Sequence, residues 1–184
     1  MYKEVNKALN VLKTGGTILY PTDTIWGIGC DIHSDEAIKK IFKIKKRELS
    51  KGFICLASSF KMIMDYVNVN QIDKLTKISR EEPTTFIFEN PMKISKFVIG
   101  NNSSIAFRVP QNQFCIELIE LFGRPIVSTS ANISGDNIPL SFNEINPLLK
   151  KMVDYTVKSS DSEKKFSASR IIKINDDGSL KIIR

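Results

Sequence analysis

The side chains best suited to chemistry in this sequence are short hydroxyls and amides that follow two predicted strands. Residues 22–24 (Thr-Asp-Thr) follow the run 17–20, and residues 130–135 (Ser-Ala-Asn-Ile-Ser-Gly) follow the run 126–129. Both runs have the length and composition of buried strands. Because ligands of open α/β sheets bind where strands end, both polar segments predict ligand contacts. The alternative for residues 22–24 is an ordinary strand-to-turn transition.

Cationic side chains form the second group of candidates. Lys45, Arg47 and Lys51 have a Lys-x-Arg-x-x-x-Lys spacing at the expected end of a helix, and Arg108 and Arg184 lie further along the chain. Lysine and arginine neutralise phosphate oxygens, and a guanidinium can pair both oxygens of a carboxylate. Such a set favours catalysis by positioning and charge stabilisation, as in transfer at phosphorus. The alternatives are complementing a helix dipole for the cluster and a surface ion pair for Arg108.

Other catalytic motifs are weaker. Gly27-Ile28-Gly29 begins like a dinucleotide fingerprint, but Ile32 stands where the third glycine belongs. A serine hydrolase needs a base, His33 is the only histidine, and no Gly-x-Ser-x-Gly elbow occurs. We therefore interpret His33 as a surface residue or a neighbour of a helix cap.

The surrounding pattern alternates helices with strands. Apolar spacing predicts a first helix over residues 5–12, ended by Gly15-Gly16, and a second helix that Asp35 caps. Further helices are expected around residues 63, 75, 115–122 and 145–152, and further strands at 53–57, 84–88, 104–109 and near 155, 171 and 180. Gly27 and Gly29 should let a second segment approach closely, since neither carries a Cβ.

Length and charge limit the class of protein. The chain has 184 residues, of which 42% are apolar, and its size suits one domain spanning residues 1–184. The longest polar stretch, 158–165, predicts a surface loop. The net charge of +7 favours an anionic partner such as a nucleotide or RNA.

Cysteine spacing and hydropathy narrow the class further. Cys30, Cys55 and Cys115 lie in separate apolar runs, so neither a disulfide framework nor a metal-site spacing results. Residues 1–14 carry charges throughout, and no run of about eighteen apolar residues occurs. We expect a cytoplasmic protein with no membrane partner and no metal site of its own.

Four motifs occur in order along the chain: Tyr-Pro-Thr-Asp-Thr-x-Trp-Gly-x-Gly-Cys-Asp at 20–31, Lys-Lys-Arg-x-x-x-Lys-Gly at 45–52, Ala-Phe-Arg-Val-Pro at 106–110 and Val-Ser-Thr-Ser-Ala-Asn-x-Ser-Gly at 127–135. In this combination the chain resembles the YrdC family, which includes the threonylcarbamoyl-AMP synthases of tRNA modification. The resemblance implies an α/β fold: a short single YrdC-like domain with a twisted open mixed sheet, flanking helices and a concave basic face. The family's Pro-Gly-Pro-x-Thr segment corresponds here to residues 81–85, which lack the glycine.

The resemblance also implies a reaction. L-threonine, bicarbonate and ATP, expected with Mg²⁺, would yield threonylcarbamoyl-AMP and pyrophosphate. A separate tRNA threonylcarbamoyl transferase complex would then use the adenylate to form N6-threonylcarbamoyladenosine at position 37 of tRNAs that read ANN codons.

Site residues are carried over from the family motif by motif. The catalytic residues implied are Lys45, Arg47, Ser130 and Asn132. The ATP-binding residues implied are Lys45, Arg47, Lys51, Ser104, Ala106, Ser130, Asn132 and Arg184. The threonine-binding residues implied are Thr22, Thr24, Arg108, Ser128 and Ser169.

Two other functions remain open at this point. One is a module of the same fold that binds tRNA or double-stranded RNA without synthase activity, which the net charge permits. The other is a related enzyme that uses carbamoyl-adenylate chemistry. The chain contains neither an RNP-like aromatic pattern for the first nor an acylphosphatase-like or zinc-finger segment for the second.

Overall fold

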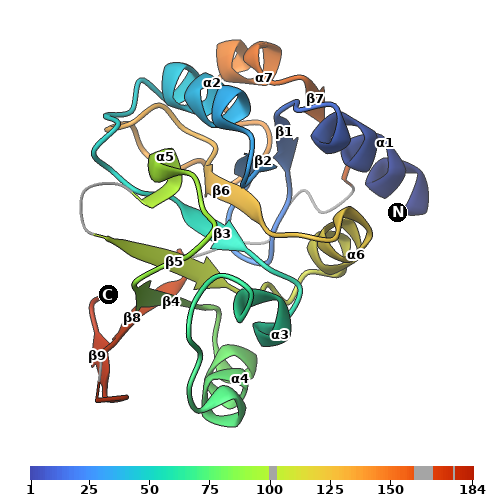
Figure 1. The fold of residues 1–184 in the computed structure, drawn as a ribbon. Coiled ribbons are helices and arrows are strands. Elements are labelled where there is room, and N and C mark those ends of the chain that lie inside the picture. The colour runs from blue at the N-terminus through green and yellow to red at the C-terminus, as the bar shows by residue number, and fades with distance from the viewer. Residues whose placement is uncertain (100–102, 160–167, 176) are drawn as a thin grey trace.

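A mixed β-sheet runs through the molecule with helices packed against it (Figure 1). The computed structural model describes residues 1–99, 103–159, 168–175 and 177–184. Within these residues the strands are β1 (Ile18–Tyr20), β2 (Gly27–Asp31), β3 (Ile54–Leu56), β4 (Thr84–Glu89), β5 (Ser104–Arg108), β6 (Ile126–Ser130), β7 (Tyr155–Thr156), β8 (Arg170–Ile174) and β9 (Leu180–Ile182). The helices are α1 (Tyr2–Lys13), α2 (Asp35–Lys45), α3 (Phe60–Ile63), α4 (Ile72–Glu81), α5 (Lys96–Ile99), α6 (Gln113–Phe122) and α7 (Pro147–Met152).

The strand order across the sheet is β7-β1-β2-β6-β3-β5-β4-β8-β9. β2 pairs antiparallel with both β1 and β6, whereas β3 pairs parallel with β5 and β4 parallel with β8. The expected α/β fold, with a mixed sheet and flanking helices, is confirmed.

The sequence pattern does not predict β2, which lies among the inner strands of the sheet. Its sequence is Gly-Ile-Gly-Cys-Asp, and glycine weakens a strand pattern because it has no side chain to pack. All five residues are buried. A Cβ at Gly29 would lie 2.5 Å from the Val127 carbonyl oxygen and 2.9 Å from Tyr20 Cε1. The close approach expected at the glycines therefore occurs inside the sheet.

Two apolar cores cover the two faces of the sheet. Buried side chains of α2, α3, α4, α5 and α7 form one core with Ile28 and Cys30 of β2. Buried side chains of α1 and α6 form the other core with Tyr20 and Ile126. α1 and α6 pack against each other, as do α2 and α7 (Figure 1). Since alternate strand residues share a face, Ser128 lies on the face that carries α1 and α6.

Most predicted elements are confirmed, with corrections at two helices. Ser34 caps α2 in place of the expected Asp35, because its side chain accepts from the Ala37 backbone N–H at 3.3 Å. The four-residue helix α5 is too short for its apolar spacing to predict. The segment 81–85 joins α4 to β4, where the Pro83 carbonyl oxygen accepts from the Arg170 backbone N–H.

The predicted surface loop and the absence of a membrane span can be compared with the described residues only. Most of the polar stretch 158–165 lies outside the described residues. Among the helices of the described part of the chain, none has the length and apolar character needed to cross a membrane.

Candidate functional site

A pocket of about 260 Å³ opens on the sheet face that also carries α1 and α6. Strands β2, β3, β5 and β6 contribute to its walls, together with the turn after β1. Eight residues predicted from the sequence line it: Thr22, Thr24, Arg47, Arg108, Ser128, Ser130, Ser169 and Arg184. A larger and more open hollow of about 940 Å³ lies between α1 and α2, but of the predicted site residues only Arg47 borders it.

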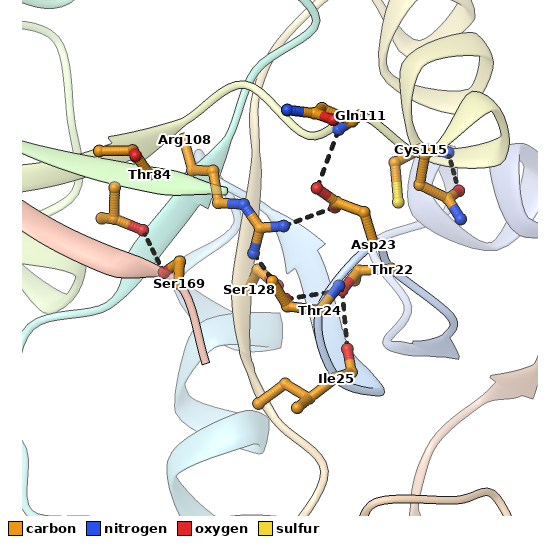
Figure 2. A network of polar contacts seen from close by, with 12 residues as sticks. Thr22, Asp23, Thr24, Ile25, Thr84, Arg108, Gln111, Cys115, Ser128 and Ser169 are labelled. Carbon is orange, nitrogen blue, oxygen red and sulfur yellow. Dashed lines mark hydrogen bonds and ion pairs between the residues drawn. The ribbon is translucent and has the colours of Figure 1, made fainter. Parts of the chain in front are cut away.

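The turn after β1 is held by its own hydroxyls. Thr22 Oγ1 donates to the Ile25 carbonyl oxygen at 2.8 Å and accepts from the Thr24 backbone N–H at 3.0 Å. The hydroxyl oxygens of Thr22 and Thr24 lie 3.0 Å apart. Both threonines are buried, so these bonds fix the direction in which Thr24 presents its hydroxyl (Figure 2).

Arg108 comes from the end of β5 and is only 5% exposed. Its Nη1 donates to Thr24 Oγ1 at 2.6 Å, and its Nη2 lies 2.5 Å from Asp23 Oδ1 (Figure 2). The contact with Asp23 has the distance of an ion pair but not hydrogen-bond geometry, and Nε has no hydrogen-bond partner within the described residues. Because an unpaired buried donor costs free energy, this guanidinium is suited to an anionic ligand such as a carboxylate.

Asp23 belongs to the polar segment 22–24 that is expected to contact a ligand, but it is absent from the threonine-binding residues carried over from the family. Its Oδ2 accepts from the Gln111 backbone N–H at 3.0 Å, which fixes the carboxylate beside Arg108 (Figure 2). The acidic partner considered as an alternative role for Arg108 therefore exists, but the pair is buried at the pocket and does not form on the surface. The position of Asp23 between two threonines of the first motif is the signal that could have identified it.

Ser128, in the middle of β6, presents its hydroxyl to the pocket. Tyr20 Oη donates to Ser128 Oγ at 2.7 Å, and the Tyr20 side chain is fully buried. Burial raises the pKa of Tyr20 well above its ordinary value. The phenol therefore stays protonated and acts as a hydrogen-bond donor.

Ser169 and Arg184 reach the pocket from the β8 side. The hydroxyl oxygens of Ser169 and Thr85 lie 2.8 Å apart, and Arg184 Nη2 donates to the Ser169 carbonyl oxygen at 2.9 Å. The two residues are therefore held together, and both line the pocket as predicted.

Lys45 is 2% exposed and does not line the pocket. Its Nζ donates to the carbonyl oxygens of Ser130 at 2.5 Å and Asn132 at 2.6 Å, and to Asn132 Oδ1 at 3.2 Å. An ammonium has three protons, so these acceptors can use all of them. Burial and the charge of Arg47 lower the pKa of Lys45 to about 8. The contacts join the end of α2 to the turn after β6 and bring the second and fourth motifs together.

The loop after α2 holds Arg47 at the edge of the pocket. Arg47 Nη2 donates to the Gly52 carbonyl oxygen at 2.6 Å, and its Nε donates to the Lys51 carbonyl oxygen at 3.2 Å. The guanidinium also lies 5.0 Å from the centre of the Phe53 ring. A Cβ at Gly52 would lie 2.6 Å from the Ile99 carbonyl oxygen, so this loop packs tightly against α5.

Four further predicted residues lie outside the pocket lining. The Lys51 side chain is exposed and forms an ion pair with Glu48 at 3.6 Å. Ser104 and Ala106 lie on β5 and are not among the lining residues, although they share a strand face with Arg108. Asn132 is adjacent to the pocket, because its Oδ1 accepts from the lining residue Ser130.

His33 is exposed and lies outside the pocket, as interpreted from the sequence. Its ring Nε2 lies 3.2 Å from Tyr66 Oη, and its backbone N–H donates to Asp31 Oδ1 at 3.0 Å. These contacts place it next to Ser34, which caps α2.

The fold and the pocket define an α/β protein with an arginine-lined, hydroxyl-rich binding site on one face of a mixed sheet. The model of the Sua5/YciO/YrdC family, described as telomere recombination, matches residues 10–184. The chain belongs to this family.

Curated relatives match about four-fifths of this chain. A protein of Psychromonas ingrahamii named threonylcarbamoyl-AMP synthase is 35% identical over 151 residues, which cover 80% of this chain and 79% of that protein. A protein of Vibrio campbellii with the same name is 33% identical over 151 residues, which cover 80% and 82%.

Solved structures share the fold. Sua5 of P. abyssi complexed with L-threonine has a TM-score of 0.83 and 21% identity, and the match covers 98% of this chain but 53% of Sua5. This chain therefore spans about half the length of that relative. E. coli YciO has a TM-score of 0.81 and 24% identity, with 100% of this chain and 89% of YciO covered.

Proposed function

We propose that this protein is a threonylcarbamoyl-AMP synthase, an enzyme that forms threonylcarbamoyl-AMP and pyrophosphate from L-threonine, bicarbonate and ATP. The observation that carries the proposal is the buried guanidinium of Arg108, whose Nε has no partner among the described residues and which lies in a pocket lined by hydroxyls and further cations. The names of the curated relatives support this activity over an RNA-binding module or a related carbamoyl-adenylate enzyme.

The threonine carboxylate is assigned to Arg108. Arg108 lines the pocket and already donates to Thr24, and its Nε and Nη2 have no hydrogen-bond partner within the described residues. Thr22 supports Thr24, and the pocket hydroxyls of Ser128 and Ser169 complete the threonine site.

The nucleotide is assigned to Arg47, Ser130 and Arg184, which line the same pocket. Arg47 is fixed by backbone carbonyls and can meet phosphate oxygens without losing these contacts, because a guanidinium has five N–H donors. Lys45 holds the end of β6 and the turn after it, where Ser130 and Asn132 lie, and so supports the ATP site without lining it. The predicted ATP contacts of Lys51, Ser104 and Ala106 have no support from the pocket geometry.

These assignments give a consistent reaction. Bicarbonate supplies carbon dioxide, which the threonine amine captures as a carbamate with the net loss of one water. A carbamate oxygen then attacks the α-phosphorus, and the bond to pyrophosphate breaks. Fixed cations stabilise the charge that develops on the leaving pyrophosphate. The chemistry needs no nucleophile from the protein and no imidazole.

Magnesium is proposed to enter with ATP. The pocket presents hydroxyls and arginines, its described lining includes no carboxylate side chain, and Asp23, which contacts the lining residue Arg108, is paired with that arginine. Among the described residues, no three His, Cys, Asp or Glu side chains gather as a metal site. Since Mg²⁺ prefers phosphate oxygens and water, the phosphates of ATP would supply its ligands and the metal would offset their charge.

The downstream steps follow from the proposed product. A separate transferase would use the adenylate to form N6-threonylcarbamoyladenosine at position 37 of tRNAs that read ANN codons. Direct binding of tRNA or double-stranded RNA, a cytoplasmic location and a single domain over residues 1–184 stay predictions.

The proposal is tested by leaving out one substrate at a time. The purified chain should release pyrophosphate from ATP only when threonine and bicarbonate are both present. Serine and valine in place of threonine serve as controls for recognition of the side chain. Pyrophosphate release that is the same without threonine would contradict the proposed function.

A further inference from the structure

Tyr20 reaches Ser128 by crossing an intervening strand. Tyr20 belongs to β1 and Ser128 to β6, and β2 lies between them. Neighbouring strands are about 4.8 Å apart, so the two residues belong to strands about 10 Å apart. The Tyr20 ring must therefore lie across β2 for its hydroxyl to donate to Ser128 Oγ at 2.7 Å.

Two glycines of β2 make this path possible. Gly27 and Gly29 share one face of β2, because alternate residues of a strand point to the same side. A Cβ at Gly29 would lie 2.9 Å from Tyr20 Cε1, and a Cβ at Gly27 would lie 3.4 Å from Tyr20 Cζ and 3.2 Å from Ser128 Oγ. Gly27 and Gly29 of the first motif thus leave a space over β2, here called the trough, in which the Tyr20 ring lies.

The direction of the hydrogen bond decides what Ser128 can do. The buried phenol of Tyr20 keeps its proton and gives it to Ser128 Oγ. A serine hydroxyl has one proton of its own, which must then point elsewhere. Since Ser128 lines the pocket, its O–H can donate to a ligand there.

We propose that Tyr20 is a positioning residue that makes Ser128 a hydrogen-bond donor to an anionic oxygen of the bound amino acid or of its carbamate. The inference rests on the proposed function and adds to it a residue, Tyr20, that directs the Ser128 proton toward the bound threonine. Tyr20 touches no substrate, and it acts only through the Ser128 hydroxyl.

The test is the variant Tyr20→Phe in the full chain, which removes one oxygen atom and keeps the ring in its trough. The KM for threonine should rise by about tenfold, the size expected for a hydrogen bond to a charged group. The KM for ATP should stay within about twofold. Tyr155→Phe is a matched control, because that hydroxyl donates to Glu4 at 2.6 Å outside the pocket lining.

A double-mutant cycle separates positioning from a structural role. Ser128→Ala should raise the KM for threonine, and adding Tyr20→Phe to it should have no further effect on that constant. Equal increases for threonine and ATP, or effects of the two substitutions that simply add, would overturn the inference. So would a wild-type threonine KM in Tyr20→Phe. If the wild-type chain shows no threonine-dependent reaction at all, the proposed function fails and the inference fails with it.

Discussion

At the scale of single residues, the pairing of Arg108 with Asp23 and Thr24 determines what the pocket can hold. Arg108 is almost fully buried, its Nη2 is paired with Asp23, and its Nε has no hydrogen-bond partner within the described residues. A carboxylate that enters beside this pair gains charge-assisted hydrogen bonds with a fixed planar group. The geometry of the guanidinium is therefore as important as its charge.

We expect Arg108→Lys to be poorly tolerated although it preserves the charge. A lysine offers a point charge and cannot pair both carboxylate oxygens while also holding Thr24. The KM for threonine should rise by about tenfold or more, and the affinity for ATP should be nearly unchanged. Kinetics with each substrate varied in turn will show this, and an unchanged threonine dependence would mean that Arg108 only balances Asp23.

A substitution at Arg47 should weaken the binding of ATP. Arg47→Ala removes a fixed cation at the pocket edge, and we expect a loss of about 1.5–3 kcal/mol in ATP binding. Lys46→Ala is the control, because Lys46 is exposed at the end of α2 and does not line the pocket. ATP titrations in which the two variants behave alike would refute the assignment of the phosphates to Arg47.

Sequence motifs identified the pocket residues whose side chains are polar and whose spacing is distinctive. They could not show that the Lys45 ammonium donates its hydrogen bonds to Ser130 and Asn132, because these contacts depend on how α2 packs against the end of β6. They also could not separate Asp23 from an ordinary turn residue. Its role follows from the approach of β5, which is distant in the sequence.

At the scale of secondary structure, the glycines of β2 have the largest effect on the site. Strands such as β3 and β6 are predictable because apolar residues begin them and no glycine interrupts them. β2 is not predictable, because two of its five residues are glycines and the strand lacks a hydrophobic pattern. These glycines leave room for the Tyr20 ring that crosses the strand. The two glycines therefore make β2 hard to predict from the sequence, and they also allow Tyr20 to reach Ser128 at the pocket.

Gly29→Ala should destabilise the fold more than Gly27→Ala. The new methyl group at Gly29 would lie 2.5 Å from the Val127 carbonyl oxygen, which is part of the sheet and cannot move aside. We expect a loss of about 1–3 kcal/mol in the free energy of unfolding, as for other overpacked interiors. Urea denaturation of both variants measures the order, and the reverse order would contradict the described packing.

At the scale of the whole molecule, three buried thiols should dominate the response to alkaline pH. Burial raises the pKa of Cys30, Cys55 and Cys115 above the ordinary value. Above about pH 8.5 the unfolded chain therefore loses three protons that the folded chain keeps, and stability falls as pH rises. Lys45 acts in the opposite direction, because its pKa of about 8 lets the folded chain release that proton first.

Three thiols outweigh one lysine, so the free energy of unfolding should fall by about 2 kcal/mol between about pH 7.5 and 9.5. Urea denaturation at both values, with a reductant present, measures the change. Cys115→Ala should make the fall smaller, because one thiol no longer contributes. Stability that rises over this interval would contradict the burial of the thiols.

The most direct test of the proposed function is to detect its product. The wild-type chain is incubated with ATP, threonine and ¹³C-labelled bicarbonate, and the nucleotides are examined by mass spectrometry. We expect a threonylcarbamoyl-AMP whose mass increases by the one labelled carbon, formed only when threonine is present and strongly reduced in Arg108→Lys. Pyrophosphate release without a labelled adenylate, or an adenylate that forms equally well without threonine, would contradict the proposed reaction.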